Sequence, residues 1–192
     1  MVPSSHPVRA LRADARRNRE ALLAVARAAF LADDSDLGVD EIARRAGVSV
    51  GTLYRHFETR EALVEEVWRA EVDALCAAPA QLLAQHAPDQ ALREFLLLIV
   101  DHAAVGKGMS DALQSLMATD SAVFDDARMR MAEALDQVLT AGVAAGRIRE
   151  GVAGRTVLRA IGAVCGMSAI EGWQKEAVQI TTILYDGLRK SD

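Results

Sequence analysis

The stretch from Ser49 to Phe57 gathers side chains that bind phosphate groups and the edges of nucleic-acid bases. It contains hydroxyl groups on Ser49 and Thr52, then the phenol of Tyr54, the guanidinium of Arg55 and an imidazole. A guanidinium donates paired hydrogen bonds to phosphate or to guanine, and hydroxyl groups donate to phosphate oxygens. No acid, base and nucleophile stand together here, so the chemistry indicated is recognition of a polyanion rather than catalysis.

The residues around this stretch supply the small apolar core of a helix-turn-helix, in which two short helices cross around a tight turn. Ala43 is small enough for a close crossing, and Gly47, four residues later, suits a left-handed backbone in the turn. Val48 anchors the turn, and Leu53 pins the second helix. Ser49 is placed to cap that helix. The other members of the predicted core are Ile42, Ala46 and Phe57.

The second helix of this motif has one face directed away from the core. At about 100° per residue, Gly51, Thr52 and Arg55 lie opposite Leu53. In a major groove, Arg55 can donate two hydrogen bonds to guanine, Thr52 can contact a thymine methyl group, and Gly51 allows close approach. Taken singly, each residue is more typical of an ordinary surface than of a DNA contact, and only the combined spacing favours DNA binding. The residues predicted to meet phosphates are Tyr54, His56 and, in the first turn of the next helix, Arg60.

Nearly the whole chain is predicted to be helical, because it has only four prolines and no stretch of alternating apolar and polar residues. Thr59 is expected to cap a long helix that ends at Pro79, since proline disfavours the helical conformation at and before its own position. The other predicted helices cover residues 11–32, 40–46, 50–57, 89–105, 110–118, 122–145, 152–171 and 176–189.

The formal net charge of −5 is unevenly distributed along the chain. Residues 1–60 hold ten Arg and no Lys against eight Asp and Glu, whereas residues 61–192 hold twelve basic and nineteen acidic residues. Arg9, Arg12, Arg16 and Arg17 make the N-terminus locally basic. A basic N-terminal region followed by an acidic remainder of the chain suggests contact with a polyanion, although the solvent-exposed start of a helix gives the same pattern.

The composition excludes several classes of protein. Hydrophobic residues make up 51% of the chain, which rules out disorder, and the longest apolar runs, 95–100 and 160–167, are far shorter than the roughly 20 residues of a membrane span. Two distant cysteines, Cys76 and Cys165, exclude a disulfide framework and suit a reducing compartment. With no signal-peptide pattern, we expect a soluble cytoplasmic protein that does not bind membranes.

No catalytic or metal-binding motif is recognisable in the sequence. The chain lacks the nucleophile elbow, the zinc-protease motif, the phosphate loop and the dinucleotide fingerprint. His102 beside Asp101, with His86 nearby, has no third metal ligand. We therefore expect no enzymatic activity, no metal and no cofactor.

Residues 40–57, with 59–63 after them, resemble the N-terminal domain of the TetR family of transcriptional regulators, and the similarity covers about residues 10–75. The resemblance implies an all-α protein, with an N-terminal three-helix domain that contains the helix-turn-helix and a C-terminal helical bundle for ligand binding and dimerisation. The residues assigned to DNA contacts are Arg9, Arg12, Arg16, Arg17, Ser49, Val50, Gly51, Thr52, Tyr54, Arg55, His56 and Arg60, the last of which stands where a lysine is usual.

The turn between the first two helices departs from the family pattern. The family usually has a glycine and an aromatic residue there, followed by Ser or Thr capping the second helix, whereas this chain has Asp34, Ser35 and Gly38. A phosphate contact from a capping hydroxyl at this turn is therefore in question. Asp33, Asp34 and Asp36 would repel DNA, so we expect them to face away from it.

The chain is divided into a basic arm with the start of the first helix at 1–15, a DNA-binding domain at 16–76 with its motif at about 38–57, and a ligand-sensing and dimerisation domain at 80–192. The predicted function is that of a ligand-responsive, homodimeric repressor, which a small and largely apolar effector releases from a palindromic operator in double-stranded DNA. The alternative is a helical small-molecule or lipid-binding protein without DNA-binding activity, which the complete motif disfavours.

The C-terminal part offers candidates for a ligand cavity and a subunit interface. Six methionines and four phenylalanines favour a plastic apolar cavity. Residues 157–170 are apolar nearly all round, which favours a helix buried on both sides, against its own core and against a second subunit. We expect the last two helices to pair with those of a second subunit as a four-helix interface, with a purely intramolecular core as the alternative. The candidate cavity residues are Phe95, Ile99, His102, Leu113, Met117, Met131, Cys165 and Trp173. The candidate interface residues are Gly162, Gly166, Ala169, Ile183, Leu184 and Leu188.

Overall fold

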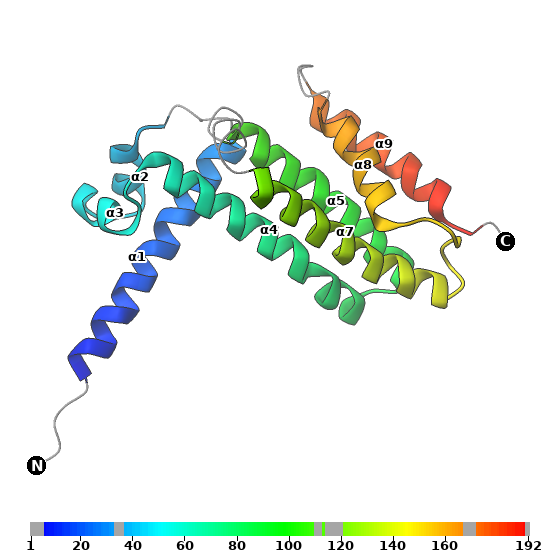
Figure 1. Cartoon of the computed structure of the whole chain (residues 1–192), viewed down its shortest axis with the longest axis horizontal. Coiled ribbons are helices and arrows are strands. Elements are labelled where there is room, and N and C mark those ends of the chain that lie inside the picture. The colour runs from blue at the N-terminus through cyan, green and yellow to red at the C-terminus, as the bar shows by residue number, and fades with distance from the viewer. Residues whose placement is uncertain (1–5, 33–36, 110–112, 114–120, 167–171, 191–192) are drawn as a thin grey trace, which may run out of the picture.

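The computed structural model describes residues 6–32, 37–109, 113, 121–166 and 172–190, and this part of the chain folds into helices joined by short connections. In Figure 1, α2 and α3 lie beside α1 and the start of α4, whereas α5, α7, α8 and α9 gather at the other end of the molecule. The prediction of an all-α protein is confirmed. The helices are α1 (His6–Leu31), α2 (Val39–Arg45), α3 (Val50–His56), α4 (Arg60–Gln85), α5 (Pro88–Gly108), α7 (Ser121–Ala144), α8 (Gly154–Gly166) and α9 (Trp173–Leu188).

The N-terminal domain is formed by the apolar stripe of α1 packed against α2, α3 and the start of α4. Leu22 and Ala26, one helical turn apart on α1, are completely buried, as are Ala43 and Leu53 of the two short helices. Thr59 caps α4 as predicted, because its hydroxyl oxygen accepts a hydrogen bond from the backbone N–H of the third helical residue at 3.1 Å.

Helix α4 shows that one prediction was wrong. The helix continues through Pro79 to Gln85 instead of ending at the proline. Pro79 has no N–H to donate, which costs roughly 3 kcal/mol in a helix. However, Pro79 is buried, and Leu82 and Leu83 beyond it pack against the C-terminal core. The burial of three apolar side chains, about 1.5–3 kcal/mol each when complete, outweighs the loss of one hydrogen bond.

Several other helix bounds also differ from the prediction. Helix α1 begins at His6 instead of residue 11, α5 ends at Gly108 instead of 105, α8 begins at Gly154 instead of 152, and α9 begins at Trp173 instead of 176. Gly172 adopts a left-handed φ of 76° directly before α9, so the backbone turns into the helix earlier than the acidic residue Glu176 suggests. The predicted helix at 110–118, apart from Leu113, and the predicted end of α8 at 167–171 lie outside the described residues, as do Asp33, Asp34 and Asp36.

Two hydrophobic clusters make up the core, and α4 contributes to both. The N-terminal cluster includes Leu63 and Val67 of α4, and it also takes in Val105 of α5 and Phe124 of α7. The C-terminal cluster is formed by α4, α5, α7, α8 and α9. The half-buried Trp68 of α4 packs against both clusters. Helix α4, which in Figure 1 runs from beside α1 and α2 to the far end of α5 and α7, therefore joins the two halves through continuous helical backbone.

The last two helices are held to the bundle by specific backbone contacts. The backbone N–H of Arg149, between α7 and α8, donates to the carbonyl of Leu188 at 2.9 Å. At the start of α8, the N–H of Gly154 donates to Asp136 Oδ1 at 2.6 Å. A Cβ at this glycine would lie only 2.4 Å from the backbone oxygen of Ala132, so the close approach of α8 to α7 requires glycine here.

Candidate nucleic-acid interface and cavity

Helix α3 presents its polar face to solvent and its apolar face to the N-terminal core. Leu53 and Phe57 are buried, while Tyr54 is 47% exposed and Arg55 is also exposed. Of the other residues assigned to DNA contacts in this region, Ser49 and Gly51 are exposed, whereas Val50, Thr52, His56 and Arg60 are half-buried. The face predicted from helical periodicity is therefore turned outward.

The turn between α2 and α3 fixes the direction of that face. Gly47 adopts a left-handed φ of 71°, and the N–H of Val48 donates to the carbonyl of Ala43 at 3.0 Å. Ser49 caps α3 as predicted, because its Oγ accepts a hydrogen bond from the N–H of Thr52 at 3.1 Å. The two hydroxyl oxygens of Ser49 and Thr52 also lie 2.9 Å apart in a hydrogen bond. The methyl group of Thr52 thus remains for contact with a base.

Helix α2 carries a charge cluster that sequence reasoning missed. Glu41 Oε2 accepts a hydrogen bond from Arg44 Nε at 2.6 Å, and Glu41 Oε1 accepts one from Arg45 Nε at 2.8 Å. The hydrogen bond from Arg44, followed by that from Arg45, lowers the pKa of Glu41 to about 2. The spacing of these residues at i, i+3 and i+4 is the signal that predicts such pairing on a helix. One carboxylate therefore partly offsets two cations next to α3.

Two contacts between α1 and α4 hold the N-terminal domain in place. Arg19 forms an ion pair with Glu66, and its guanidinium also lies 5.6 Å from the ring centroid of Phe57 at the end of α3. Arg27 donates from Nε to Glu71 at 2.5 Å. The side chain of Glu71 is only 12% exposed, so this pair is better shielded from solvent than an ordinary surface ion pair.

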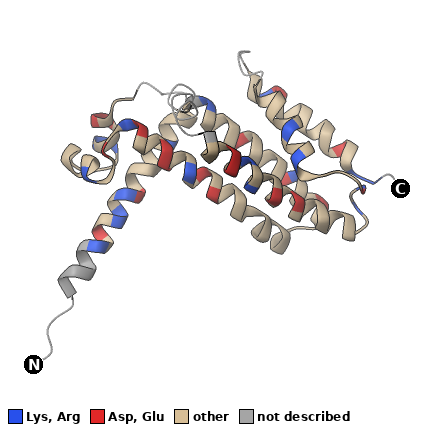
Figure 2. Ribbon diagram, viewed as in Figure 1, with Lys and Arg blue, Asp and Glu red and all other residues tan. Residues whose placement is uncertain are grey.

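The N-terminal half of α1 forms a projecting basic arm. Figure 2 shows Lys and Arg positions along this segment, which extends away from the rest of the molecule. Arg12 is exposed, Arg16 lies 3.5 Å from Glu20, and Arg17 pairs with Asp14. These pairs are largely open to solvent, where an ion pair contributes only about 0–1 kcal/mol. Arg9 lies in α1, outside the residues whose side chains are described.

A cavity of about 950 Å³ lies among α4, α5, α7 and α8. Five of the eight predicted residues line it: Ile99, His102, Leu113, Met131 and Cys165. The prediction was wrong for Phe95, which lies one helical turn before Ile99 and is completely buried in the C-terminal core. It was also wrong for Trp173, which packs on that core from α9 with the Lys107 ammonium 5.3 Å from its ring. Met117 lies outside the described residues.

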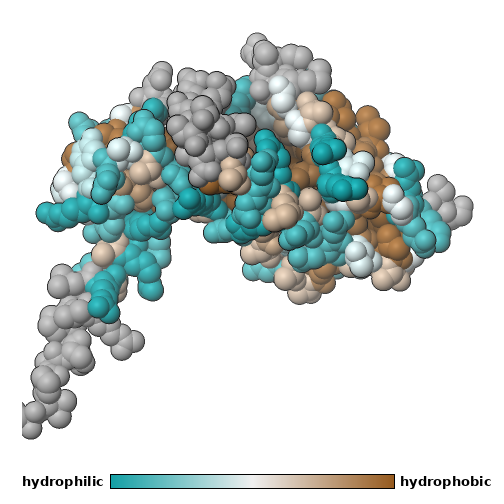
Figure 3. Space-filling model, viewed as in Figure 1, coloured by the Kyte–Doolittle hydropathy of each residue, from teal (hydrophilic) through white to brown (hydrophobic). Residues whose placement is uncertain are grey.

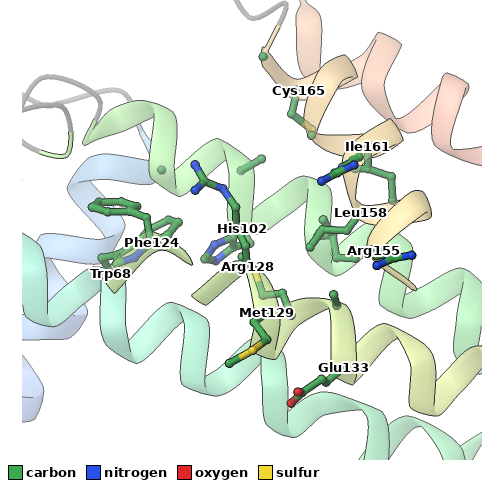
Figure 4. Close-up of a pocket in the computed structure, with 18 of the residues that line it drawn as sticks. Trp68, His102, Phe124, Arg128, Met129, Glu133, Arg155, Leu158, Ile161 and Cys165 are labelled. Atoms are coloured by element: carbon green, nitrogen blue, oxygen red, sulfur yellow. The ribbon is translucent and has the colours of Figure 1, made fainter. Parts of the chain in front are cut away.

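Several lining residues were missed by the sequence analysis. Figure 4 shows the rings of Trp68 and Phe124 beside His102, with the apolar Leu158 and Ile161 on α8 across the cavity. The signal for Trp68 was a large aromatic residue on the stripe of a long helix, but that signal does not distinguish core from cavity. The other lining residues missed include Met129 and the charged Lys107, Arg128, Glu133, Asp136, Arg155 and Arg159.

Buried polar atoms lie at the inner wall of the cavity. His102 is only 8% exposed, and its ring stacks at a tilt on Trp68 with centroids 4.7 Å apart. Neither nitrogen of His102 nor Nε1 of Trp68 has a hydrogen-bond partner among the described residues. Burial lowers the pKa of His102 to about 4, so the ring is neutral at pH 7. Burial also raises the pKa of the Cys165 thiol, which makes it a poor nucleophile.

Comparison with known proteins places this fold in a family. Residues 87–190 match the C-terminal domain of SbtR-like transcriptional regulators, and residues 22–67 match bacterial regulatory proteins of the tetR family. A TetR transcriptional regulator from Streptomyces coelicolor is 35% identical, covers 91% of this chain and 99% of its own, and superimposes with a TM-score of 0.80. The chain belongs to the TetR family of transcriptional regulators.

A second TetR regulator, from Mycobacterium vanbaalenii, is 34% identical over 94% of this chain and 99% of its own, with a TM-score of 0.72. No curated protein gives a significant match. Membership of the TetR family confirms the prediction of a DNA-binding transcriptional regulator with a helix-turn-helix. The N-terminal family match ends within α4 at residue 67, and the C-terminal match begins at residue 87, just after that helix. The predicted boundary at residues 76–80 falls within the continuous helix α4.

On this TetR-family chain, α8 and α9 carry an exposed apolar face. Figure 3 shows hydrophobic residues gathered over these two helices. Ile183 is 70% exposed. Gly162 and Gly166, predicted for the interface, are also exposed, but both line the cavity. Leu184 is half-buried, but Leu188 is only 2% exposed because it packs in the core of its own subunit, so its assignment to an interface was wrong. Ala169 lies outside the described residues. Sequence reasoning missed two exposed apolar residues of α9, Val178 and Ile180.

The described part of this TetR-family chain has neither a cluster of metal-ligating side chains nor a helix suited to span a membrane. Within it, no three His, Cys, Asp or Glu side chains come together in a way that could hold a metal ion. None of the helices described is long and apolar enough to cross a membrane.

Proposed function

We propose that this regulator is a homodimeric repressor, which leaves a palindromic operator when a small and largely apolar effector fills the cavity. The observation that carries the proposal is the position of α4, which packs into the N-terminal core through Val67 and into the C-terminal core through Val72. Trp68, directly between them, lines the cavity. A change at the cavity wall thus acts on the helix that supports the DNA-binding domain.

The outward face of α3 is proposed to enter the major groove. Arg55 donates to a guanine edge and Thr52 contacts a thymine methyl group, while Gly51 lets the helix approach the bases. The exposure of Arg55 and Gly51 supports these roles, and Arg55 forms no ion pair with any of the described residues. Val50 lies with Gly51 and Thr52 at the front of the helix, and Ser49 caps it. The residues that meet the phosphate backbone are Tyr54, His56 and Arg60.

The basic arm on α1 is proposed to add phosphate contacts beside the major groove. Arg16 and Arg17 can exchange their exposed carboxylate partners for phosphate at little cost, because solvent already screens those pairs. The exposed Arg12 and the preceding Arg9 extend the arm. Contacts of this kind depend strongly on salt and carry little sequence information.

A second copy of the chain is proposed to cover the apolar face of α8 and α9. Ile183, Ile180 and Val178 supply exposed apolar side chains on α9 for a partner helix. Gly162 and Gly166 of α8 line the cavity, so this pairing does not rest on them. Pairing about a twofold axis would present two α3 helices to one side of the DNA. A spacing of about 34–36 Å, or a multiple of it, lets both helices read successive major grooves.

The effector is proposed to act by favouring a dimer in which the two α3 helices no longer match this spacing. It can shift the equilibrium only by its difference in affinity between the two states. A cavity whose wall includes Trp68 of α4 provides such a difference, because any movement of that ring changes the packing between the two cores.

A gel-shift assay tests this function. Duplexes from the intergenic region upstream of the gene are incubated with the protein and excess unrelated DNA at moderate salt. We expect a discrete, competitor-resistant complex, weaker binding without loss of sequence preference for Tyr54→Phe and Arg60→Ala, and unchanged binding for Arg149→Ala, an exposed arginine between α7 and α8. Failure of the wild-type protein to prefer any of these duplexes over the competitor would contradict the proposal.

A further inference from the structure

The cavity is lined by more cations than carboxylates, although the part of the chain that contains it is acidic. Residues 61–192 hold nineteen acidic residues against twelve basic ones. The lining reverses this balance, with four basic and two acidic side chains. These are Lys107, Arg128, Arg155, Arg159, Glu133 and Asp136.

Two of the four basic side chains have no acidic partner among the described residues. Arg128 lies 3.0 Å from Asp125, and Lys107 lies over the ring of Trp173. By contrast, Arg155 and Arg159 form no ion pair or hydrogen bond with any described side chain. They stand one helical turn apart on α8, so both guanidinium groups belong to the same side of that helix. Figure 4 shows Arg155 on α8 beside the apolar Leu158.

The inner wall provides a second, independent sign of a ligand. Buried polar atoms in folded proteins are nearly always hydrogen-bonded, and an exception calls for a missing partner. Nε1 of Trp68 and both ring nitrogens of His102 are such exceptions, and both residues line the cavity. The cavity wall also includes the apolar side chains of Ile99, Phe124 and Ile161. An empty packing void would not be expected to combine buried polar atoms without hydrogen bonds, on Trp68 and His102, with two exposed arginines that have no acidic partner among the described residues.

We propose, resting on the effector-responsive function above, that the cavity takes an amphipathic carboxylic acid. Its carboxylate is bound by Arg155 and Arg159, and its apolar body lies between α5, α7 and α8 towards Trp68 and His102. The planar guanidinium matches a carboxylate with two parallel hydrogen bonds, and its charge is weakly hydrated compared with an ammonium group. A neutral amphiphile gains only the apolar contacts, and a cationic amphiphile is repelled by the two arginines.

Three alkyl probes of equal chain length test the proposal without DNA. Binding of dodecanoate, 1-dodecanol and dodecylamine, each below its micelle-forming concentration, is followed by the fluorescence of Trp68 in a Trp173→Phe background. We expect dodecanoate to bind at least about tenfold more tightly than the other two, which corresponds to about 1.4 kcal/mol. The double variant Arg155→Gln, Arg159→Gln should bind dodecanoate no more tightly than 1-dodecanol. The matched control Arg149→Gln, outside the cavity, should retain the full preference.

The outcomes separate this proposal from its alternatives. Equal affinities for the three probes, a preference for dodecylamine, no binding of dodecanoate, or an unchanged preference in the double variant would each overturn it. Leu158→Phe narrows the cavity from α8 without adding a second tryptophan, and it should weaken the binding of dodecanoate. Unchanged binding would also overturn the proposal. If dodecanoate binds as expected but does not release operator DNA, the ligand chemistry stands and the effector-driven release fails.

Discussion

The indole of Trp68 on α4 and the imidazole of His102 on α5 stack with ring centroids 4.7 Å apart, in the space where the two hydrophobic clusters meet. Phe124 of α7 extends the stack, with its ring centroid 5.6 Å from that of Trp68. Three helices thus meet through three rings at the cavity wall. The three rings contact one another through apolar surfaces, but the indole of Trp68 and the imidazole of His102 have nitrogens with no hydrogen-bond partner among the described residues. A ligand in the cavity can therefore change the packing of this ring stack by hydrogen-bonding to those nitrogens.

Two substitutions of Trp68 should separate the contribution of its ring packing from that of its unpaired N–H. Trp68→Phe keeps a ring between the clusters and removes the unpaired N–H, so the free energy of unfolding should stay within about 1 kcal/mol of wild type. Trp68→Ala removes the ring and should lower the free energy of unfolding by about 3 kcal/mol. Urea denaturation followed by circular dichroism measures both. If the alanine variant were as stable as the phenylalanine variant, the ring of Trp68 would contribute little to the free energy of unfolding.

His102 should make the protein less stable in mild acid. Burial lowers its pKa to about 4 in the folded state, while nearby Glu71 raises the pKa and Arg27 lowers it further. The unfolded chain, with a histidine pKa of about 6.5, binds a proton that the folded chain does not, so stability is full above pH 7 and falls as the pH drops towards 4. Between pH 7 and pH 5 the wild type should lose about 2 kcal/mol more than His102→Leu. Equal losses in the two proteins would mean that the imidazole is protonated in the fold.

The cap of α3 should contribute to the stability of the helix-turn-helix. Ser49→Ala removes the oxygen that accepts from the N–H of Thr52 at 3.1 Å, and the free energy of unfolding should fall by about 1 kcal/mol. Ser49→Thr keeps an acceptor at the same position and should cost less. Thermal unfolding of the two variants gives the comparison, and an equal effect of both substitutions would argue against a role for the hydrogen bond.

A single charged substitution tests whether the apolar face of α8 and α9 is an interface between two subunits. Ile183→Asp places a carboxylate at a side chain that is 70% exposed in the subunit, so folding should change by less than about 0.5 kcal/mol. In a dimer the same charge would be buried without a partner, and the complex should dissociate at least about tenfold more readily. Light scattering after size-exclusion chromatography reports the mass. The control is Leu31→Asp, an exposed leucine at the end of α1, which should leave the mass unchanged. A monomeric wild type, or a dimeric Ile183→Asp, would contradict the proposed interface.

The helix-turn-helix was predictable because its determinants are local in sequence. Ala43, Gly47, Ser49 and Leu53 lie within eleven residues, and each has a role that depends on its immediate neighbours. The crossing, the left-handed turn, the cap and the buried anchor are all present as expected. Helical periodicity then sufficed to place Arg55 on the outward face.

The cavity and the course of α4 were predicted less well because they depend on packing between distant segments. Pro79 was taken as a helix end from its backbone chemistry, yet tertiary burial carries the helix past it. Phe95 and Ile99 share one face of α5, and nothing in the sequence indicates that only Ile99 reaches the cavity. Trp68 was missed for the same reason, since its role arises from α5 and α7 meeting α4 at that position.

The most direct test of the proposal that α3 reads DNA is selection of bound sequences from a pool of random duplexes. Wild-type protein should enrich a palindromic motif, with guanine specified at one position of each half-site and half-sites about one helical turn apart or a multiple of it. Arg55→Ala should keep binding the pool but lose the preference at that position, a discrimination of about 1–3 kcal/mol. No enriched motif for the wild type, or the same motif for Arg55→Ala, would contradict the account.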